Sequence, residues 1–269
     1  MTPSGPMDVF TLQAEREFRS AVRPIYRNTP LEPRPVQVGS ALLLNLGGTP
    51  TVVTAAHILR ELSQHQCSLY VGGSVGAGLV PIMGGRRLAT PGDRVDHMDV
   101  AMWQPDEKAV ESLGGVEFVG SERLTKDSQP EEGRLYTALG YPVSRNKKAI
   151  DHSGRSVTTR VSMYTARASH QPRLAGELGI SGTDHLFLEL GKHAFTGDGE
   201  QMNVFGTQGL SGGALLDLGV FMSDESLYRD PMGNARLAGM VIEYHRPHRV
   251  LVAVKIDAVL TLLHAASAG

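Results

Sequence analysis

Ser211 lies between glycines in the segment QGLSGGALLD, residues 208–217, just before an apolar run that predicts a strand. Small neighbours let a substrate carbonyl reach the serine hydroxyl, and they let the backbone turn so that N–H groups point inward. A nucleophile of acyl transfer needs both properties. Ser181 also lies between glycines, in GISGT at 179–183, but it lacks the second following glycine and the strand, so a turn is the simpler interpretation.

His57 is the candidate base for this serine. A serine hydroxyl is nearly inert at neutral pH, and histidine is the side chain whose unperturbed pKa lies nearest that range. His57 follows an apolar, β-branched run, and a lone histidine in such a place is more often structural than catalytic. Whether His57 is catalytic therefore depends on the other candidate residues of the site. The base needs an acceptor that fixes its tautomer. Asp99 is preferred over Asp93 and Asp96 because only Asp99 directly precedes an alternating strand.

Short apolar segments separated by glycine, proline, asparagine or aspartate make up most of the chain. This pattern favours a β barrel or sandwich over alternating strands and helices, so the expected fold class is all-β. The expected strands lie within residues 36–46, 51–56, 68–73, 77–83, 99–104, 134–141, 156–166, 185–190, 212–218, 237–244 and 249–256.

Helices are expected at four places. Apolar residues recur at helical spacing over 11–27, and the prolines of 28–36 end this first helix. The other three helices are expected at 57–64, 106–113 and 256–267.

A polar stretch at 125–133 is the expected boundary between two halves of the chain.

The composition excludes several classes of protein. The chain has 269 residues and a formal net charge of −2 at pH 7, which gives no field of one sign that would gather nucleic acid or anionic lipid. No apolar stretch approaches the roughly 20 residues of a membrane helix, and the N-terminal segment does not read as a signal peptide. Cys67 is the only cysteine, which suits a reducing compartment. We therefore expect a cytoplasmic protein with neither nucleic acid nor a membrane as partner.

The order and spacing of the three candidate residues are specific. His57 precedes Asp99 by 42 residues, and Asp99 precedes Ser211 by 112. In this order TAAH, an aspartate followed by VA, and GLSGG resemble the three signatures of the chymotrypsin-like (trypsin-like) serine peptidases, in the non-secreted branch without disulfides. VGSALLL and LAGMVIEY are similar to the strands that precede the histidine and follow the serine in that family. The likeness covers residues 36–263.

The resemblance implies a fold and a division of the chain. It implies two packed six-stranded β barrels, with the catalytic cleft between them and a C-terminal helix that closes the domain. The peptidase domain would cover 31–269, with barrel 1 at 31–124 and barrel 2 at 134–269. Residues 1–30 would form an N-terminal helical extension.

The resemblance also implies the chemistry of a serine endopeptidase that acts on protein or peptide substrates. His57, Asp99 and Ser211 would form a triad that works through an acyl-enzyme, with no cofactor and no metal. The backbone N–H groups of Gly209 and Ser211 match the oxyanion hole. Phe205 matches the base of the primary substrate pocket, and the segment that pairs with the substrate backbone is Ile242, Glu243 and Tyr244.

Two departures from the family pattern concern activation and compartment. Leu210 stands where secreted members carry the aspartate that pairs with a newly released N-terminus, so that route of activation is not expected. The oxyanion hole would then be formed from the start, or be completed by a partner protein, an oligomer or the substrate, and the sequence leaves this choice open. Ile58 replaces the disulfide cysteine that follows the histidine in secreted members.

Other motifs have simpler interpretations. His245 and His248 have a metal-like spacing, but no second pair of ligands accompanies them, and a solvated loop is expected. The glycine-rich segment at 72–78 lacks the lysine of a P-loop and leads into a strand, which predicts a turn. Cys67 reads as a buried side chain.

Two other functions remain. An α/β-hydrolase esterase also uses G-x-S-x-G, but it places its aspartate and histidine after the serine. A catalytically silent, peptidase-like module that binds a protein is the second. For an active enzyme we expect restricted protein substrates, of the kind found in stress-response or immune-type signalling.

Overall fold

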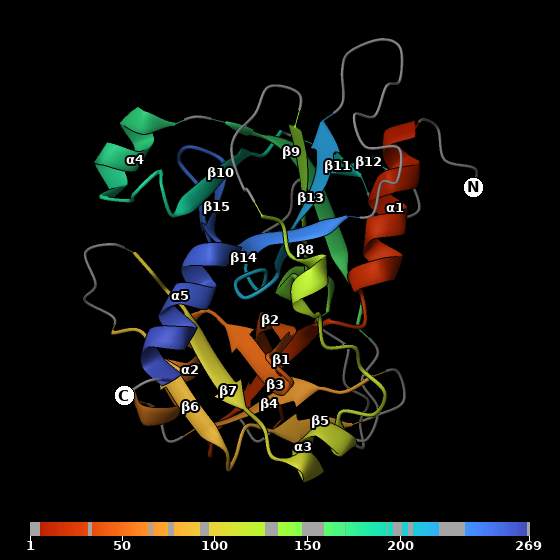
Figure 1. Cartoon of the computed structure of the whole chain (residues 1–269), viewed down its shortest axis with the longest axis vertical. Helices are drawn as coiled ribbons and strands as arrows, with labels where there is room; N and C mark the ends of the chain where they lie inside the picture. The colour runs from red at the N-terminus through yellow and green to blue at the C-terminus, as the bar shows by residue number, and fades with distance from the viewer. Residues whose placement is uncertain are drawn as a thin grey trace.

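The strands of the protein form two groups that follow each other along the chain, a first sheet in the lower half of Figure 1 and a second barrel above it. The structure is a computed structural model. It describes residues 6–31, 34–64, 67–74, 78–91, 97–126, 134–146, 159–169, 171–191, 193–195, 201–203, 207–220 and 235–267.

The first sheet has seven strands in the order β5-β4-β1-β2-β3-β7-β6. Successive side chains of a strand point to opposite faces of the sheet, and both faces of the central strand β2 are buried. Leu42 and Leu44 face the core shared with the second barrel, whereas Ala41 and Leu43 face the core of the first sheet itself. The strands are β1 (Val22–Asn28), β2 (Val36–Leu46), β3 (Thr49–Thr54), β4 (Ser68–Gly72), β5 (Leu79–Pro81), β6 (Arg86–Ala89) and β7 (Ala101–Gln104).

The second group closes into a six-stranded barrel in the order β10-β15-β14-β13-β8-β9. The expected all-β, two-barrel class is confirmed. One detail differs, because the first sheet has seven strands and, within the described residues, does not close. The barrel strands are β8 (Arg134–Gly140), β9 (Ser162–Ser169), β10 (His185–Glu189), β13 (Ala214–Val220), β14 (Arg236–His245) and β15 (Val250–Lys255), and a separate hairpin is formed by β11 (His193–Phe195) and β12 (Gln201–Asn203).

The expected first helix is wrong in its second half. The helix α1 (Pro6–Phe18) ends early, and the chain continues as β1, which pairs with β2 and β4. Pro24 explains the difference, because a proline inside a helix lacks a donor and clashes with the preceding turn. The first sheet therefore begins before residue 31. The other helices are α2 (Ala56–Gln64), α3 (Glu107–Ser112), α4 (Pro172–Leu178) and α5 (Ile256–Ser267), with 3₁₀ turns η1 (Ser121–Arg123) and η2 (Val143–Arg145).

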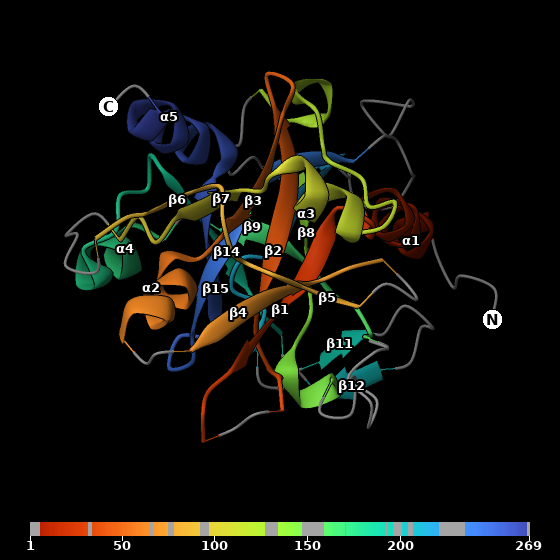
Figure 2. The ribbon, with the colours of Figure 1, turned by 90° about the horizontal axis from the view of Figure 1, so that it is seen from below.

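A continuous hydrophobic core joins the two halves. Phe18 of α1, Val53 of β3, Val252 of β15 and Leu263 of α5 belong to the same buried cluster. Figures 1 and 2 show α1 and α5 on opposite sides of the molecule, with α5 running from the second barrel toward the first sheet. This packing fixes the halves against each other, as a site between them requires.

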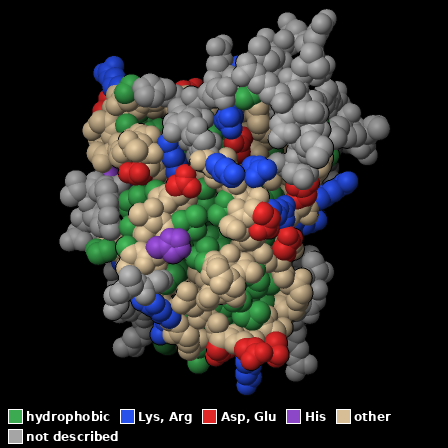
Figure 3. Space-filling view, in the orientation of Figure 1, with side chains coloured by type: hydrophobic (Ala, Val, Ile, Leu, Met, Phe, Trp, Pro, Cys, Tyr) green, Lys and Arg blue, Asp and Glu red, His purple; other side chains and the backbone are tan. Residues whose placement is uncertain are grey.

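The surface carries mixed charges. On the face in Figure 3, basic and acidic side chains are interspersed around a central hydrophobic area. Among the described residues, no helix is both long and apolar enough to span a membrane.

Candidate active site

Pairing between β3 and β7 brings His57 and Asp99 together. Thr54, the last residue of β3, is opposite Ala101, the first residue of β7, in an antiparallel register. The residues that follow Thr54 and those that precede Ala101 therefore lie at the same end of the sheet. Here α2 begins at Ala56, and the Ala56 N–H donates to the Asp99 carbonyl at 3.2 Å.

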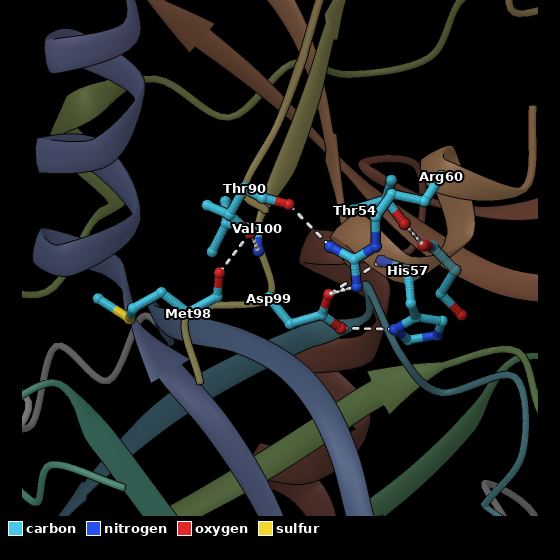
Figure 4. Close-up of polar contacts among 8 residues, drawn as sticks. Thr54, His57, Arg60, Thr90, Met98, Asp99 and Val100 are labelled. Atoms are coloured by element: carbon cyan, nitrogen blue, oxygen red, sulfur yellow. Dashed lines mark hydrogen bonds and ion pairs between the residues drawn. The ribbon is translucent and has the colours of Figure 1, made fainter. Parts of the chain in front are cut away.

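The Asp99 carboxylate contacts His57 twice (Figure 4). Oδ1 accepts the His57 backbone N–H at 2.9 Å, and Oδ2 lies 2.5 Å from ring Nδ1. An ionised carboxylate only accepts hydrogen bonds, so Nδ1 carries the proton and Nε2 of a neutral ring is left as an acceptor. The side chains are 46% exposed for His57 and 21% for Asp99, so the ring remains open to a ligand.

Arg60 fixes Asp99 from the other side. Its Nη2 lies 3.2 Å from Asp99 Oδ1, and its Nη1 donates to the Thr90 carbonyl at 2.7 Å. Burial by itself raises the pKa of the Asp99 carboxyl, but the hydrogen bonds and charge of His57, followed by the charge of Arg60, outweigh burial and leave the pKa below its ordinary value. Asp99 is therefore held ionised.

Ser211 lies in a tight turn that leads into β13. The turn is held by its carbonyl groups: Gln208 C=O accepts from Val143 N–H at 2.8 Å, and Ser211 C=O accepts from Ser40 N–H at 2.8 Å. Leu210, the residue before the candidate nucleophile, is 1% exposed in the core of the second barrel. The turn is thus anchored by apolar burial and by the first sheet.

The N–H groups of Gly209 and Ser211 have no acceptor among the described residues, whereas Leu210 N–H donates to Thr207 C=O at 2.9 Å and Gly212 N–H to Val241 C=O at 2.7 Å. Gly209 has a φ of +96°, a conformation that glycine adopts without strain. Both groups expected to form an oxyanion hole are thus unpaired within the described residues.

The structure places Ser211 near the start of α2 but shows no hydrogen bond between its hydroxyl and the His57 ring, both of which lie in the described part of the chain. Gly39 on β2 shows that the Ser211 backbone and the α2 residue Ile58 lie close together, because both lie next to it. A methyl group there would lie 2.2 Å from Cδ1 of Ile58 and 3.2 Å from the Ser211 carbonyl oxygen. The structure therefore shows the His57–Asp99 pair, and the part of Ser211 in a triad stays a prediction.

The expected substrate-binding segment lies on β14. Ile242 is buried, and Glu243 and Tyr244 are half-buried. Just before them, Val241 N–H donates to Gly213 C=O at 2.9 Å, so this strand follows directly on the serine turn. Phe205 lies outside the described residues.

The alternative motifs are structural where they are described. The Ser181 hydroxyl accepts from Thr183 N–H at 3.1 Å, which is a turn. β4, which ends at Gly72, pairs antiparallel with β5, which begins at Leu79, and residues 75–77 between them lie outside the described residues. His245 and His248 have ring centroids 5.0 Å apart, and in the described residues they join no group of three or more metal ligands. Asp93 and Asp96 lie outside the described residues.

Sequence reasoning missed three residues that brace the site, Ser40, Arg60 and Thr90. Each acts through contacts distant in sequence: the Ser40 hydroxyl donates to the Gly209 carbonyl, 169 residues away. No local pattern marks such a contact. Of the three, only Arg60 could have been found from the sequence. It lies three residues after His57 in the helix expected at 57–64, and residues three apart share a helix face.

Comparison with known proteins supports the fold. No protein-family model and no curated protein sequence matches the chain. Among solved structures, the chain is similar to the serine endoprotease from Yersinia pestis, with a TM-score of 0.53, 16% sequence identity, and coverage of 98% of this chain and 67% of the endoprotease chain. At this identity the likeness shows the fold alone. The protein has a chymotrypsin-like two-barrel fold.

Proposed function

We propose that the protein is a serine endopeptidase with His57, Asp99 and Ser211 as its triad. The observation that carries the proposal is the doubly bonded His57–Asp99 pair beside a glycine-flanked serine turn. The unpaired N–H groups at this turn, and a fold shared with a serine endoprotease, support the same chemistry.

In the proposed mechanism His57 Nε2 takes the proton of the Ser211 hydroxyl as Oγ attacks a peptide carbonyl. Asp99 stabilises the imidazolium that forms, and the free N–H groups of Gly209 and Ser211 receive the oxyanion. His57 then gives its proton to the leaving amine, and the acyl group stays on Ser211. Water activated by His57 hydrolyses this ester and restores the serine. The mechanism requires Oγ to come within hydrogen-bond distance of Nε2 in the substrate complex, and catalytic hydrogen bonds often tighten only when a substrate binds.

A fluorophosphonate probe tests this proposal, because Ser211 Oγ would displace fluoride and form a stable phosphonyl ester. We expect labelling of Ser211 in the wild type and none in Ser211→Ala or His57→Ala. Loss of either residue should lower turnover about a millionfold. The matched control is Ser181→Ala, which removes a serine that also lies between glycines and should label normally.

A catalytically silent, protein-binding module is the second candidate. The missing hydrogen bond between the Ser211 hydroxyl and the His57 ring favours it. Folded wild-type protein that the probe labels under no condition, with or without protein substrates, would favour this candidate and refute the first.

The proposed substrates are a few protein partners. Mapping of new N-termini after expression of the wild type beside Ser211→Ala should give a short set of cleavage sites. Broad digestion of casein by the purified protein would contradict restricted specificity.

A further inference from the structure

We propose that Ser40 is a positioning residue that holds the oxyanion hole in its working form, so that the enzyme needs no activating partner. This inference rests on the proposed function and concerns the regulation of the same site. It is carried by contacts between β2 of the first sheet and the serine turn of the second barrel.

Ser40 is fully buried and has a defined partner for every polar atom. Its N–H donates to the Ser211 carbonyl at 2.8 Å, and its hydroxyl donates to the Gly209 carbonyl at 2.7 Å. The same hydroxyl accepts the Tyr141 N–H at 2.9 Å. Because that N–H is a donor only, the hydroxyl hydrogen is free for Gly209, and both hydroxyl contacts are satisfied at once. One side chain thus ties two segments of the second barrel to the first sheet.

These contacts orient the Gly209 N–H. A peptide unit is planar and trans, so an N–H points opposite to the preceding carbonyl. The Gln208 carbonyl is held by the Val143 N–H, and the Gly209 carbonyl is held by Ser40, so the peptides on both sides of Gly209 are fixed. The Gly209 N–H is left facing away from Val143, without a partner in the described residues.

The Ser211 N–H is oriented by the same logic. The Leu210 carbonyl accepts from Gly213 N–H at 2.7 Å, which directs the Ser211 N–H to the other side. The Ser211 carbonyl is in turn held by Ser40. Both free N–H groups are therefore set by contacts present in the chain alone.

The Ser40 backbone also reaches the histidine side of the site. Its carbonyl accepts the Thr54 hydroxyl at 2.7 Å, three residues before His57. A methyl group on Gly212 would lie only 1.9 Å from the same carbonyl oxygen, so the turn is closely packed against β2. To flip the Gln208–Gly209 peptide, the Val143 contact must break and Gly209 must move from Ser40. A collapsed hole thus costs two hydrogen bonds, of which the Ser40–Gly209 bond is buried and expensive to leave unmade.

Ser40→Ala tests the role of the hydroxyl, with the rate of fluorophosphonate labelling as readout because negative charge builds on the phosphoryl oxygen during the reaction. We expect the maximal labelling rate to fall about 10- to 100-fold, less than the roughly 100- to 1,000-fold seen when an oxyanion donor is removed outright, because the N–H is misplaced and not lost. Probe affinity should be nearly unchanged. Ser40→Thr, which keeps the hydroxyl, should recover most of the rate. The matched control is Thr51→Val, which removes the hydroxyl of a fully buried residue of the same sheet whose one side-chain hydrogen bond, among the described residues, is to Thr49 C=O.

Val143→Pro tests the second anchor of the Gln208–Gly209 peptide without a change in Ser40, and it keeps the preformed hole open to test if Ser40→Ala does not fold. Proline removes the N–H that holds the Gln208 carbonyl, at the first position of η2 where proline is tolerated. We expect a similar loss in maximal rate. Folded variants that label at the wild-type rate would overturn the role of Ser40, and wild type that labels only after addition of a partner would overturn the preformed hole. Wild type that never labels would refute the proposed function itself.

Discussion

Asp99 holds His57 through both carboxylate oxygens, one on the backbone N–H and one on ring Nδ1. The first contact fixes the start of α2 against β7, and the second fixes the tautomer and direction of the ring. A residue that accepts at both atoms orients the base more tightly than a single contact does.

Asp99→Asn should disable the base while the fold persists. An amide that accepts with its oxygen at one of these atoms must present NH₂ at the other, so the ring turns or its tautomer changes. We expect the labelling rate of Ser211 to fall about 10⁴-fold, the size of effect found for this substitution in a serine peptidase triad. Asp257→Asn, an exposed acid in the first turn of α5, is the charge-matched control and should leave the rate unchanged. A rate within a few-fold of the wild type would remove Asp99 from the triad.

Arg60→Met should weaken the site by releasing Asp99 on one side. The guanidinium bridges Asp99 Oδ1 and the Thr90 carbonyl, and methionine keeps the apolar stem without either contact. We expect a loss of about 10-fold in the labelling rate, since small misplacements of catalytic groups are costly. Arg60→Lys should lie between, because an ammonium is a point charge that does not span both acceptors equally. Equal rates in all three proteins would show that Arg60 contributes nothing to the alignment.

The sequence predicted those helices and strands well whose hydrophobic pattern agrees with their packing in the folded protein. The bounds of β2 and α5 were expected to the residue, because long apolar runs with clear ends decide them. The region of β1 was misread since Phe18, Val22 and Ile25 also recur at helical spacing, and only pairing with β2 and β4 shows that the strand prevails. The His57–Asp99 contact followed from the motifs. The role of Ser40 did not, because its contacts join two halves of the chain that meet only in the folded protein.

His185 should make the protein less stable as the pH falls. It is 2% exposed, and its Nδ1 lies 2.9 Å from the Ser181 carbonyl, so Nδ1 carries a proton and donates to that carbonyl. Burial lowers the pKa of His185, and the carbonyls of Ser181 and His97 and the charge of Asp184 raise it by less. The folded pKa thus lies below the unfolded pKa of about 6.5. Stability from this group is complete above that pH and is lost as the pH falls below it, because the unfolded chain binds the extra proton.

Urea unfolding of the wild type and His185→Asn at pH 7.5 and at pH 5.5 measures this effect. Asparagine keeps a donor near the Ser181 carbonyl and does not titrate. We expect the free energy of unfolding to decrease more for the wild type than for the variant across this interval. The difference between the two proteins isolates His185 from the other histidines. Parallel decreases would mean that His185 is protonated equally in the folded and unfolded chains.

Gly212→Ala should be far more destabilising than Gly219→Ala, although both glycines have nearly the same backbone conformation. Their φ angles are +85° and +89°, so alanine carries a similar backbone strain at each, about 1–3 kcal/mol. A methyl group at Gly212 would lie 1.9 Å from the Ser40 carbonyl oxygen, whereas a methyl group at Gly219 meets nothing within 4 Å. Overpacking adds about 1–3 kcal/mol at Gly212 alone, because β2 must move to admit the methyl group.

The two alanine variants can be compared by urea unfolding followed through Trp103, the only tryptophan, which is 1% exposed and reports the first sheet. A displaced β2 would also shift the Ser40 N–H away from the Ser211 carbonyl. Gly212→Ala should therefore lose probe labelling under conditions where it is still folded, while Gly219→Ala labels as the wild type does. Equal loss of stability in the two variants would mean that the serine turn does not press on β2, and the link between the two halves at Ser40 would have to be abandoned.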